Sequence, residues 1–131
     1  MNEKRIVMLS EKRRFMRADK ILRVQYALLP GPEERPGFKK AEALNISAGG
    51  MKLAVPEYIE QGRELILQFI LPVHNNYRKF KVLSVTTRTV SVEKAETADT
   101  FHVGVKFINI RKSELDVINK YVMRILWSGG R

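Results

Sequence analysis

Most of the chain alternates between apolar and polar residues, a pattern that predicts β-strands buried on one face. The first such run places Leu22, Val24, Tyr26 and Leu28 on one side of a strand. Prolines and glycines between residues 29 and 37 interrupt the pattern and predict a loop. Similar runs follow, and the predicted strands lie at residues 22–28, 39–46, 51–55, 63–71, 78–92 and 101–107.

Two of these strands depart from simple alternation. In the strand at 63–71, Ile66 and Ile70 lie opposite the main apolar face, so we expect this strand to be covered on both sides and to end at Pro72. In the strand at 78–92, the apolar positions change parity between Val82 and Val85. That change predicts a β-bulge or a bend.

The last part of the chain changes to the period of a helix. An apolar stripe begins at Leu115 and continues through Ile118, Tyr121, Val122, Ile125 and Leu126. Ser113 and Asp116 resemble a capping box at the start of this helix, and the pair of glycines at 129–130 predicts its end. The helix is therefore expected at about residues 113–127.

Together these elements predict an all-β fold with a C-terminal helix. Short strands separated by turn signals favour a six-stranded antiparallel β-barrel, closed or nearly closed, with the helix covering an open end or a flank. We expect residues 1–18 to be a flexible N-terminal leader and residues 19–131 to form one domain.

Composition fits one globular domain. The chain has 131 residues, of which 44% are hydrophobic and 29% charged. It has no cysteine, so disulfides and thiolate metal sites are excluded and a reducing cytoplasm is the expected compartment. No apolar run approaches the roughly 18 residues that a membrane-spanning helix needs. The N-terminal sequence also lacks the pattern of a secretory signal, so we expect a cytoplasmic protein without a membrane span.

The formal net charge of +10 indicates an anionic partner. Nucleic acid, a nucleotide, an acidic membrane surface and an acidic protein face would all satisfy this charge. The basic residues are spread along the chain, and a dense run occurs only between Lys12 and Lys20. Charge alone does not choose among these partners.

Within the basic run, Arg13 and Arg17 form the pattern R-x-x-x-R. A guanidinium group offers a planar fork of donors that matches a phosphate or the O6/N7 edge of guanine, and its face stacks on a base. Lys12 and Arg14 add positive potential beside the pair. Taken alone, the same pattern also fits an ordinary solvated basic surface.

A second motif, NISAGG, contains Asn45, Ser47, Gly49 and Gly50. The asparagine amide can both donate to and accept from a base edge, and the serine hydroxyl can bind a phosphate or the turn itself. The two glycines permit positive φ and a close approach of a ligand to the backbone. Taken alone, this motif also fits a simple turn between two strands.

With both motifs in this order, the chain resembles the PilZ domain family, the bacterial receptor modules for cyclic di-GMP. The resemblance extends from Lys12 to Val122 and includes Gly104 in the later strand sequence FHVGVKF. The second motif matches the family signature [D/N]-x-S-x-x-G. The family's fold, a six-stranded antiparallel barrel of the split-barrel type with a C-terminal helix, agrees with the pattern described above.

The resemblance implies a cyclic di-GMP receptor that uses no cofactor or metal. The ligand-binding residues that it implies are Arg13, Arg17, Asn45, Ser47 and Gly50, with Lys12, Arg14 and Gly49 as auxiliaries. The arginines would contact guanines and phosphates, the asparagine a guanine edge and the serine a phosphate. Whether one or two ligand molecules bind is left open.

The positions of the motifs also imply a switch. Because the arginines lie on the leader and the second motif on the barrel, a bound ligand would bridge them and order the leader. The changed surface would then signal to a protein effector, with an output such as motility or exopolysaccharide production. The sequence does not identify this effector, and it fits a monomer or a homodimer.

An enzyme fits the sequence less well. The two histidines, His74 and His102, lie in a polar loop and at a strand edge, and no serine lies in a nucleophile elbow. Glu57, Glu60 and Glu64 are expected to form a solvated acidic patch and not an acid–base pair. We therefore expect no catalytic residues.

Two binding functions remain as alternatives. A basic β-barrel that binds single-stranded nucleic acid needs exposed aromatic platforms, whereas Phe69, Phe80, Phe101 and Phe107 are expected mainly on apolar faces. Trp127 lies in the tail of the predicted helix, so core packing is expected for it as well. Binding to single strands would also weaken steeply with salt, whereas dinucleotide binding would be saturable and specific for guanine. The other alternative is a PilZ-type adaptor that binds proteins but no ligand.

Overall fold

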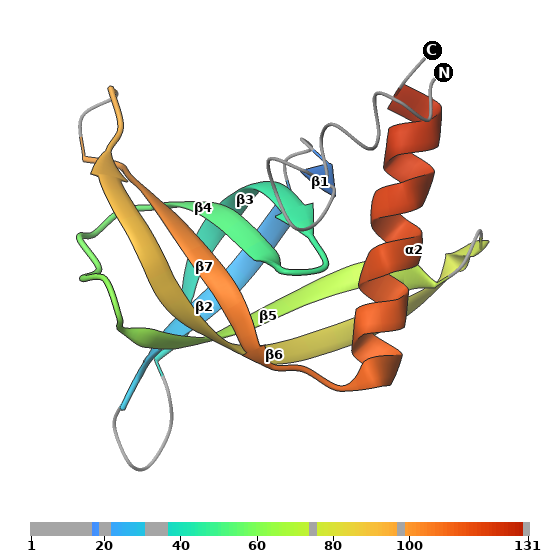
Figure 1. Cartoon of the computed structure of the whole chain (residues 1–131), viewed down its shortest axis with the longest axis horizontal. Helices are drawn as coiled ribbons and strands as arrows, with labels where there is room; N and C mark the ends of the chain where they lie inside the picture. Colours follow the sequence, from blue (N-terminus) through green and yellow to red (C-terminus); the bar gives the residue numbers. More distant parts are fainter. Residues whose placement is uncertain (1–16, 19–21, 31–36, 74–75, 97–98, 130–131) are drawn as a thin grey trace.

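The computed structural model describes residues 17–18, 22–30, 37–73, 76–96 and 99–129. Its elements are the strands β1 (Arg17–Ala18), β2 (Leu22–Leu29), β3 (Lys39–Ser47), β4 (Gly50–Val55), β5 (Glu64–Val73), β6 (Asn76–Lys94) and β7 (Phe101–Asn109), and the helix α2 (Lys112–Gly129). Figure 1 shows strongly coiled strands that wrap around a common centre, with the helix standing beside them.

Six of these strands close into an antiparallel barrel. Their order is β3-β2-β5-β6-β7-β4, and the ring closes because β4 also pairs with β3. The short strand β1 adds to the far end of β3. This arrangement confirms the predicted barrel with one C-terminal helix, and the predicted strand positions agree with the observed ones to within a few residues.

The apolar positions that alternate along the sequence form the centre of this barrel. Large aliphatic side chains from successive strands are fully buried there, among them Leu53, Leu65, Leu67, Leu71, Leu83, Val85 and Val103. Burying one such side chain contributes about 1.5–3 kcal/mol relative to leaving it in water. The closed ring therefore follows from strands that each have one apolar face to bury.

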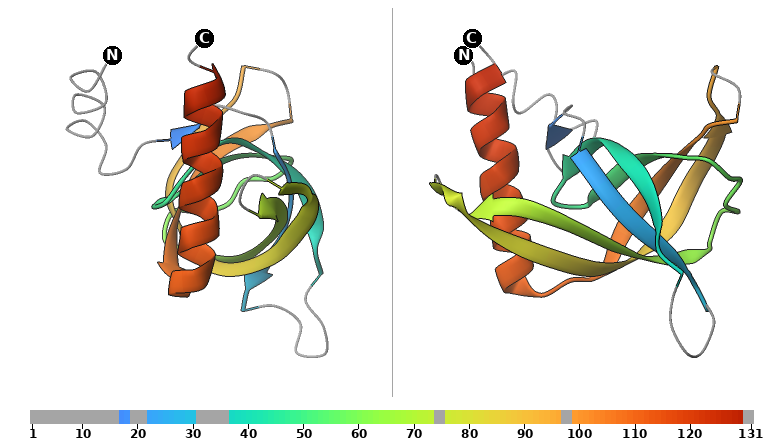
Figure 2. Two further views of the ribbon diagram at one scale, coloured as in Figure 1. Left: turned by 90° about the vertical axis from the view of Figure 1, so that its right-hand side faces the viewer. Right: turned by 180° about the vertical axis from the view of Figure 1, so that it is seen from behind.

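Helix α2 runs across one end of the barrel, with the ring of strands behind it in the left view of Figure 2. Its buried side chains Ile118, Tyr121 and Val122 belong to the same core as the strands. At its start, Glu114 Oε1 accepts a hydrogen bond of 3.2 Å from the backbone N–H of Arg111. The predicted capping box was therefore placed wrongly, since Glu114 closes the first turn in place of Ser113 and Asp116.

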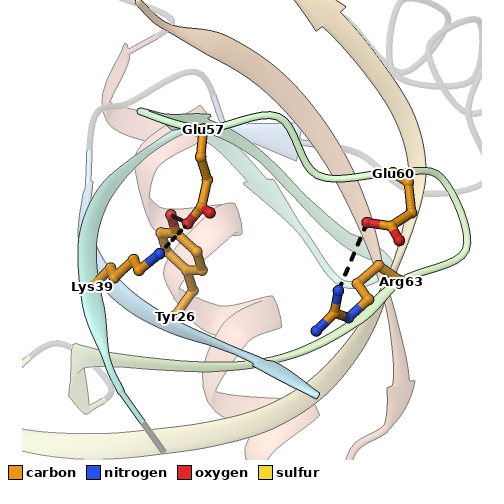
Figure 3. Close-up of polar contacts among 5 residues, drawn as sticks. All are labelled: Tyr26, Lys39, Glu57, Glu60 and Arg63. Carbon is orange, nitrogen blue, oxygen red and sulfur yellow. Dashed lines mark hydrogen bonds and ion pairs between the residues drawn. The ribbon is translucent and has the colours of Figure 1, made fainter. Parts of the chain in front are cut away.

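The loop at residues 56–63 lies at the end of the barrel away from the helix (Figure 1). A buried tyrosine holds this loop, because Tyr26 Oη donates a 2.5 Å hydrogen bond to Glu57 Oε2, and Lys39 Nζ donates one of 2.8 Å to the same oxygen. Figure 3 shows these contacts beside the ion pair between Glu60 and Arg63.

These contacts raise the pKa of the Tyr26 hydroxyl and lower the pKa of the Glu57 carboxyl. Burial raises the pKa of Tyr26 well above its ordinary value, and the hydrogen bond to Glu57 and its negative charge raise it further. Burial also raises the pKa of Glu57, but hydrogen bonds from Lys39 and Tyr26 outweigh that effect and lower it overall. The loop is thus attached to the barrel by a carboxylate that remains ionised at neutral pH.

Strands β5 and β6 correct three predictions. Ile70 is 54% exposed, so β5 is not covered on both faces. The strand also continues through Pro72 to Val73, which is possible because β5 pairs there only with β6 and needs no donor on its other edge. No bulge separates Val82 from Val85: the pairing with β5 is regular there, and Val82 is simply an exposed residue of the outer face.

Candidate functional site

The second motif lies at the end of β3, where the strand contains a β-bulge. Pairing with β4 joins Ala43 to Leu53 and then Asn45 to Lys52, so Leu44 is an extra residue without a partner in β4. Without this extra residue, the alternation of a regular strand would place Ile46 on the outer face and direct Asn45 toward the core.

The bulge therefore sets which side chains of the motif face outward. Ala43 and Ile46 are both fully buried although they are three positions apart, and the intervening Asn45 and the following Ser47 are only half-buried. No hydrogen bond joins the Asn45 amide to another side chain or backbone group in the described part of the chain. This amide can thus both donate to and accept from a ligand.

The Ser47 hydroxyl organises the turn between β3 and β4. Its Oγ accepts hydrogen bonds from the backbone N–H groups of Gly49, at 3.1 Å, and Gly50, at 3.3 Å. The backbone N–H of Phe107 in β7 donates to the Gly49 carbonyl at 2.9 Å. Of the two roles that the sequence left open for this serine, the structure therefore contains the one within the turn.

Gly50 is required by packing and not by its backbone angle. It does not have the positive φ that the sequence pattern suggested, which among the described glycines occurs at Gly62. Instead, a Cβ atom at position 50 would collide with the backbone carbonyl oxygen of Val105 in β7. The glycine lets β4 pass close to β7 where the barrel closes.

The structure brings part of the first motif to the second. Strand β1 pairs with β3 so that Arg17 lies directly opposite Ser47 and Ala18 opposite Ile46. The backbone of one motif arginine is therefore placed at the end of β3, beside the turn. Arg13, Lys12 and Arg14 lie outside the described residues, so their place at this site stays a prediction. Of the leader predicted at residues 1–18, the structure describes only Arg17 and Ala18, which pair as β1, so its flexibility stays a prediction.

Two lysines beside the motif were missed by the sequence reasoning. Lys52 lies opposite Asn45 in β4, and Lys106 lies opposite Gly50 in β7. The Lys52 ammonium is 3.6 Å from a carboxylate oxygen of Glu93, whereas Lys106 is exposed. Both residues alternate with buried apolar neighbours, so their outward direction could have been derived from the sequence, but their nearness to the motif required the strand register.

Gly104, which the family resemblance included, also has a packing role. It lies opposite Lys52 in β7 and opposite Ser91 in β6. A Cβ atom at position 104 would meet the Ser91 hydroxyl oxygen at 2.5 Å. The glycine therefore makes room for Ser91 beside a register shift of β6.

The acidic residues singled out in the sequence each contact a cation. Glu57 binds Lys39, Glu60 lies 3.7 Å from Arg63, and Glu64 lies 2.8 Å from Arg88, so they form separate ion pairs and not one solvated patch. Among the described residues, no three acidic or histidine side chains gather closely enough to hold a metal ion.

The aromatic residues only partly follow the prediction. Phe69 and Phe107 are buried, and Phe101 is half-buried and packs against the core, as predicted. Phe80 and Trp127 do not follow the prediction, because they are 60% and 66% exposed. No helix within the described ranges combines the length and the apolar composition needed to cross a bilayer.

The sequence pattern of the PilZ domain family matches residues 11–124. The match covers both motifs, all seven described strands and most of helix α2. No curated protein sequence matches the chain.

Several solved structures have the same fold. The inhibitor of motility MotI/DgrA of Bacillus subtilis superposes with a TM-score of 0.74 and 20% identity; the match covers 91% of this chain and 53% of that protein, so the chain spans about half its length. The PilZ domain of Escherichia coli YcgR, solved with c-di-GMP, superposes with a TM-score of 0.62 and 13% identity, covering 90% of this chain and 94% of that domain.

A third similar structure is an assembly. A tetrameric PilZ domain from Xanthomonas campestris, self-assembled through a helical bundle, superposes with a TM-score of 0.54 and 9% identity, and the match covers 89% of each chain. At these identities the likeness establishes the fold alone.

Proposed function

Because the chain belongs to the PilZ domain family, we propose that it is a cytoplasmic, non-catalytic receptor for cyclic di-GMP that acts on a protein effector. One observation carries this proposal: β1 sets Arg17 directly opposite Ser47, so segments of the two motifs meet at the end of β3. The similarity to the YcgR domain solved with c-di-GMP supports the choice of ligand.

Each part of the site suits one part of this ligand. The guanidinium groups of Arg17 and Arg13 match the guanine edges and the two phosphates. The Asn45 amide would bind a guanine edge, the Ser47 hydroxyl would donate to a phosphate, and the turn from Ser47 to Gly50 would pack beneath the base. Lys52 and Lys106 add positive charge on the neighbouring strands.

The proposed signal is a change in the N-terminal leader. Binding of cyclic di-GMP between the barrel and Arg13 would order residues 1–16 against the end of β3, with Lys12 and Arg14 as auxiliary contacts. The free energy for this ordering would come from contacts that exist only in the bound state. The newly formed surface would be what the effector recognises.

Calorimetric titration of the full chain with cyclic di-GMP tests the proposal. We expect saturable binding by the wild type, and a loss of at least about 10-fold in affinity for Arg13→Ala and Arg17→Ala, because hydrogen bonds to charged groups contribute about 1.5–3 kcal/mol each. Asn45→Ala should cost less, about 2- to 10-fold, because it removes a neutral hydrogen bond of about 0.5–1.5 kcal/mol. Arg23→Ala is a matched control because Arg23 is an exposed arginine on β2. Cyclic di-AMP tests specificity for guanine. Absence of heat with the folded wild type would refute the proposal.

A ligand-independent PilZ-type adaptor is the second candidate. It is favoured by the fact that Ser47 and Gly50 have complete structural explanations, since one holds the turn and the other lets β4 pass β7. The adaptor would bind its partner equally well with and without cyclic di-GMP. The titration above separates the two candidates, because an adaptor of this kind gives no heat although its thermal unfolding is normal.

A further inference from the structure

The outer face of the barrel has a hollow that is separate from the candidate ligand site. It extends across the outer surfaces of β4, β3, β2, β5 and β6 and has a volume of about 1070 Å³. We call it the outer groove, and define it by Ile70, Val82, Arg23, Lys40 and Glu42. Its volume is at the upper limit for pockets that hold a drug-sized molecule, so it suits a peptide segment better than one side chain.

One end of the outer groove is apolar and open to solvent. Ile70 and Val82 lie directly opposite each other on β5 and β6 and are 54% and 64% exposed. Phe80, the next outward residue of β6, lies beyond the lining of the groove and is 60% exposed. Single exposed apolar residues are common, but three large ones side by side on the outside of a small barrel indicate a contact surface.

The neighbouring part of the outer groove is positively charged. Arg23 and Lys40 project from β2 and β3, and neither forms an ion pair with another described residue. Glu42 is the one carboxylate among the described lining residues. It lies opposite Arg23 in the strand register, but their charged atoms are not within ion-pair distance. As far as the described residues go, two cations are thus available to an incoming anion.

This charge argues against a second copy of the chain as the occupant. In a symmetric dimer formed through this face, the same patch of each copy would meet its equivalent. Arg23 and Lys40 would then approach like charges, on a chain whose formal net charge is already +10. A partner of opposite charge avoids this repulsion.

We propose that the outer groove is a docking surface for an extended segment of a partner protein, in which apolar residues are followed by acidic ones. The apolar residues would pack on Ile70, Val82 and Phe80, and the carboxylates would pair with Arg23 and Lys40. Neighbouring strands are about 4.8 Å apart, so a segment of about six extended residues covers the distance from β6 to β4. The residues that define this surface do not belong to the candidate cyclic di-GMP site, so this proposal extends the proposed function and does not depend on it.

Fluorescence anisotropy with labelled eight-residue peptides tests this proposal on the full chain. The probe has four leucine or valine residues followed by four glutamates. One control peptide replaces the glutamates with lysines, and the other replaces the apolar residues with serines. We expect saturable binding of the probe alone, because both halves of the groove must be occupied. Equal binding of either control, or no binding of the probe, would refute the proposal.

Matched variants locate the binding on the protein. Val82→Ser and Ile70→Ser should weaken probe binding at least about 10-fold, whereas Val90→Ser, at a 48% exposed valine of the same strand β6, should not change it. Arg23→Glu should weaken it similarly, and Lys112→Glu, at an exposed lysine of helix α2, should not. Circular dichroism verifies that each variant is folded.

Two further results would contradict the proposal. Equal losses in Val82→Ser and Val90→Ser would show that the groove is not the binding site. A dimer in sedimentation experiments that disappears in Val82→Ser would show that this face binds a second copy of the chain. Cyclic di-GMP titration of the same variants should give wild-type affinity, which separates a failure of this surface from a failure of the proposed receptor function.

Discussion

Gly50 shows at the residue scale how closely the barrel strands approach one another. A Cβ atom there would collide with the carbonyl oxygen of Val105, which belongs to the backbone and cannot move aside. We expect Gly50→Ala to lower the free energy of unfolding by ~2 kcal/mol, the usual cost of overpacking, as measured by urea denaturation. Gly37→Ala is the control, because no atom lies within 4 Å of its added Cβ. Equal denaturation midpoints for the two variants would contradict this account.

Glu57 gives a prediction that depends on pH. The pKa of its carboxyl is below the ordinary value of 4.5, so the folded protein favours the charged form. The stabilisation that the charged Glu57 carboxylate gives to the folded protein is therefore complete above about pH 4.5. It is lost as the pH falls through the lower pKa that this carboxyl has in the folded state. Glu57→Gln should lower the free energy of unfolding by ~1 kcal/mol at pH 7, and the difference from wild type should disappear in acid.

The control for this prediction is a neighbouring glutamate in the same loop. Glu60 is 61% exposed at its side chain, and its contact with Arg63 is long at 3.7 Å. Exposed ion pairs contribute little to stability. Glu60→Gln should therefore change the free energy of unfolding little at any pH. If its effect depended on pH as strongly as that of Glu57→Gln, the loss in both variants would come from the net charge of the protein and not from the contacts of Glu57 with Tyr26 and Lys39.

At the scale of elements, the residue that caps the start of helix α2 differs from the one predicted from the sequence. Glu114 is 4% exposed and accepts a hydrogen bond from the Arg111 N–H, whereas Ser113 is exposed. Glu114→Ala should therefore lower the free energy of unfolding by ~1 kcal/mol, the typical value of a helix cap. Ser113→Ala should leave it nearly unchanged. A larger loss of stability in Ser113→Ala than in Glu114→Ala, measured by thermal denaturation, would instead support the predicted capping box of Ser113 and Asp116.

The elements themselves could largely be predicted from the sequence, because alternation and helical period are local properties. The face of the strand on which an individual side chain lies could not always be predicted. In β6 the exposed Val82 suggested a change of parity that the pairing with β5 does not contain. In β3 the true bulge at Leu44 left only the odd spacing between the buried Ala43 and Ile46 as its signal. Which apolar residues are exposed is decided by neighbouring strands.

The candidate site could be predicted in part for the same reason. Asn45, Ser47 and Gly50 are visible as a motif, but the approach of Arg17 to Ser47 depends on the pairing of β1 with β3. Lys52 and Lys106 join the site through β4 and β7, whose positions around the barrel are not local information. The motif in the sequence therefore identified the turn, whereas the residues around the turn are known only from the pairing of the strands.

At the scale of the whole molecule, the closed ring should make the barrel unfold as one unit, because each strand is paired on both sides over part of its length. Cyclic di-GMP at about 100 times its Kd should stabilise this unit by ~2.7 kcal/mol. Scanning calorimetry should then record a single transition that moves upward by roughly 10 °C. At the same ligand concentration the shift should fall to about half or less in Arg17→Ala, whose affinity is expected to be at least about 10-fold lower. A shift of the wild-type size in that variant would place the ligand elsewhere.

The turn from Ser47 to Gly50 has a consequence for how related sequences are interpreted. A descendant that no longer needed cyclic di-GMP would still benefit from this serine and this glycine, because the serine holds the turn and the glycine lets β4 pass close to β7. Selection for folding would thus preserve half of the signature after binding was lost. Asn45, whose amide has no hydrogen bond within the described chain, is free to drift once the ligand is gone. In a genome survey, the asparagine and the arginines are the better markers of a working receptor.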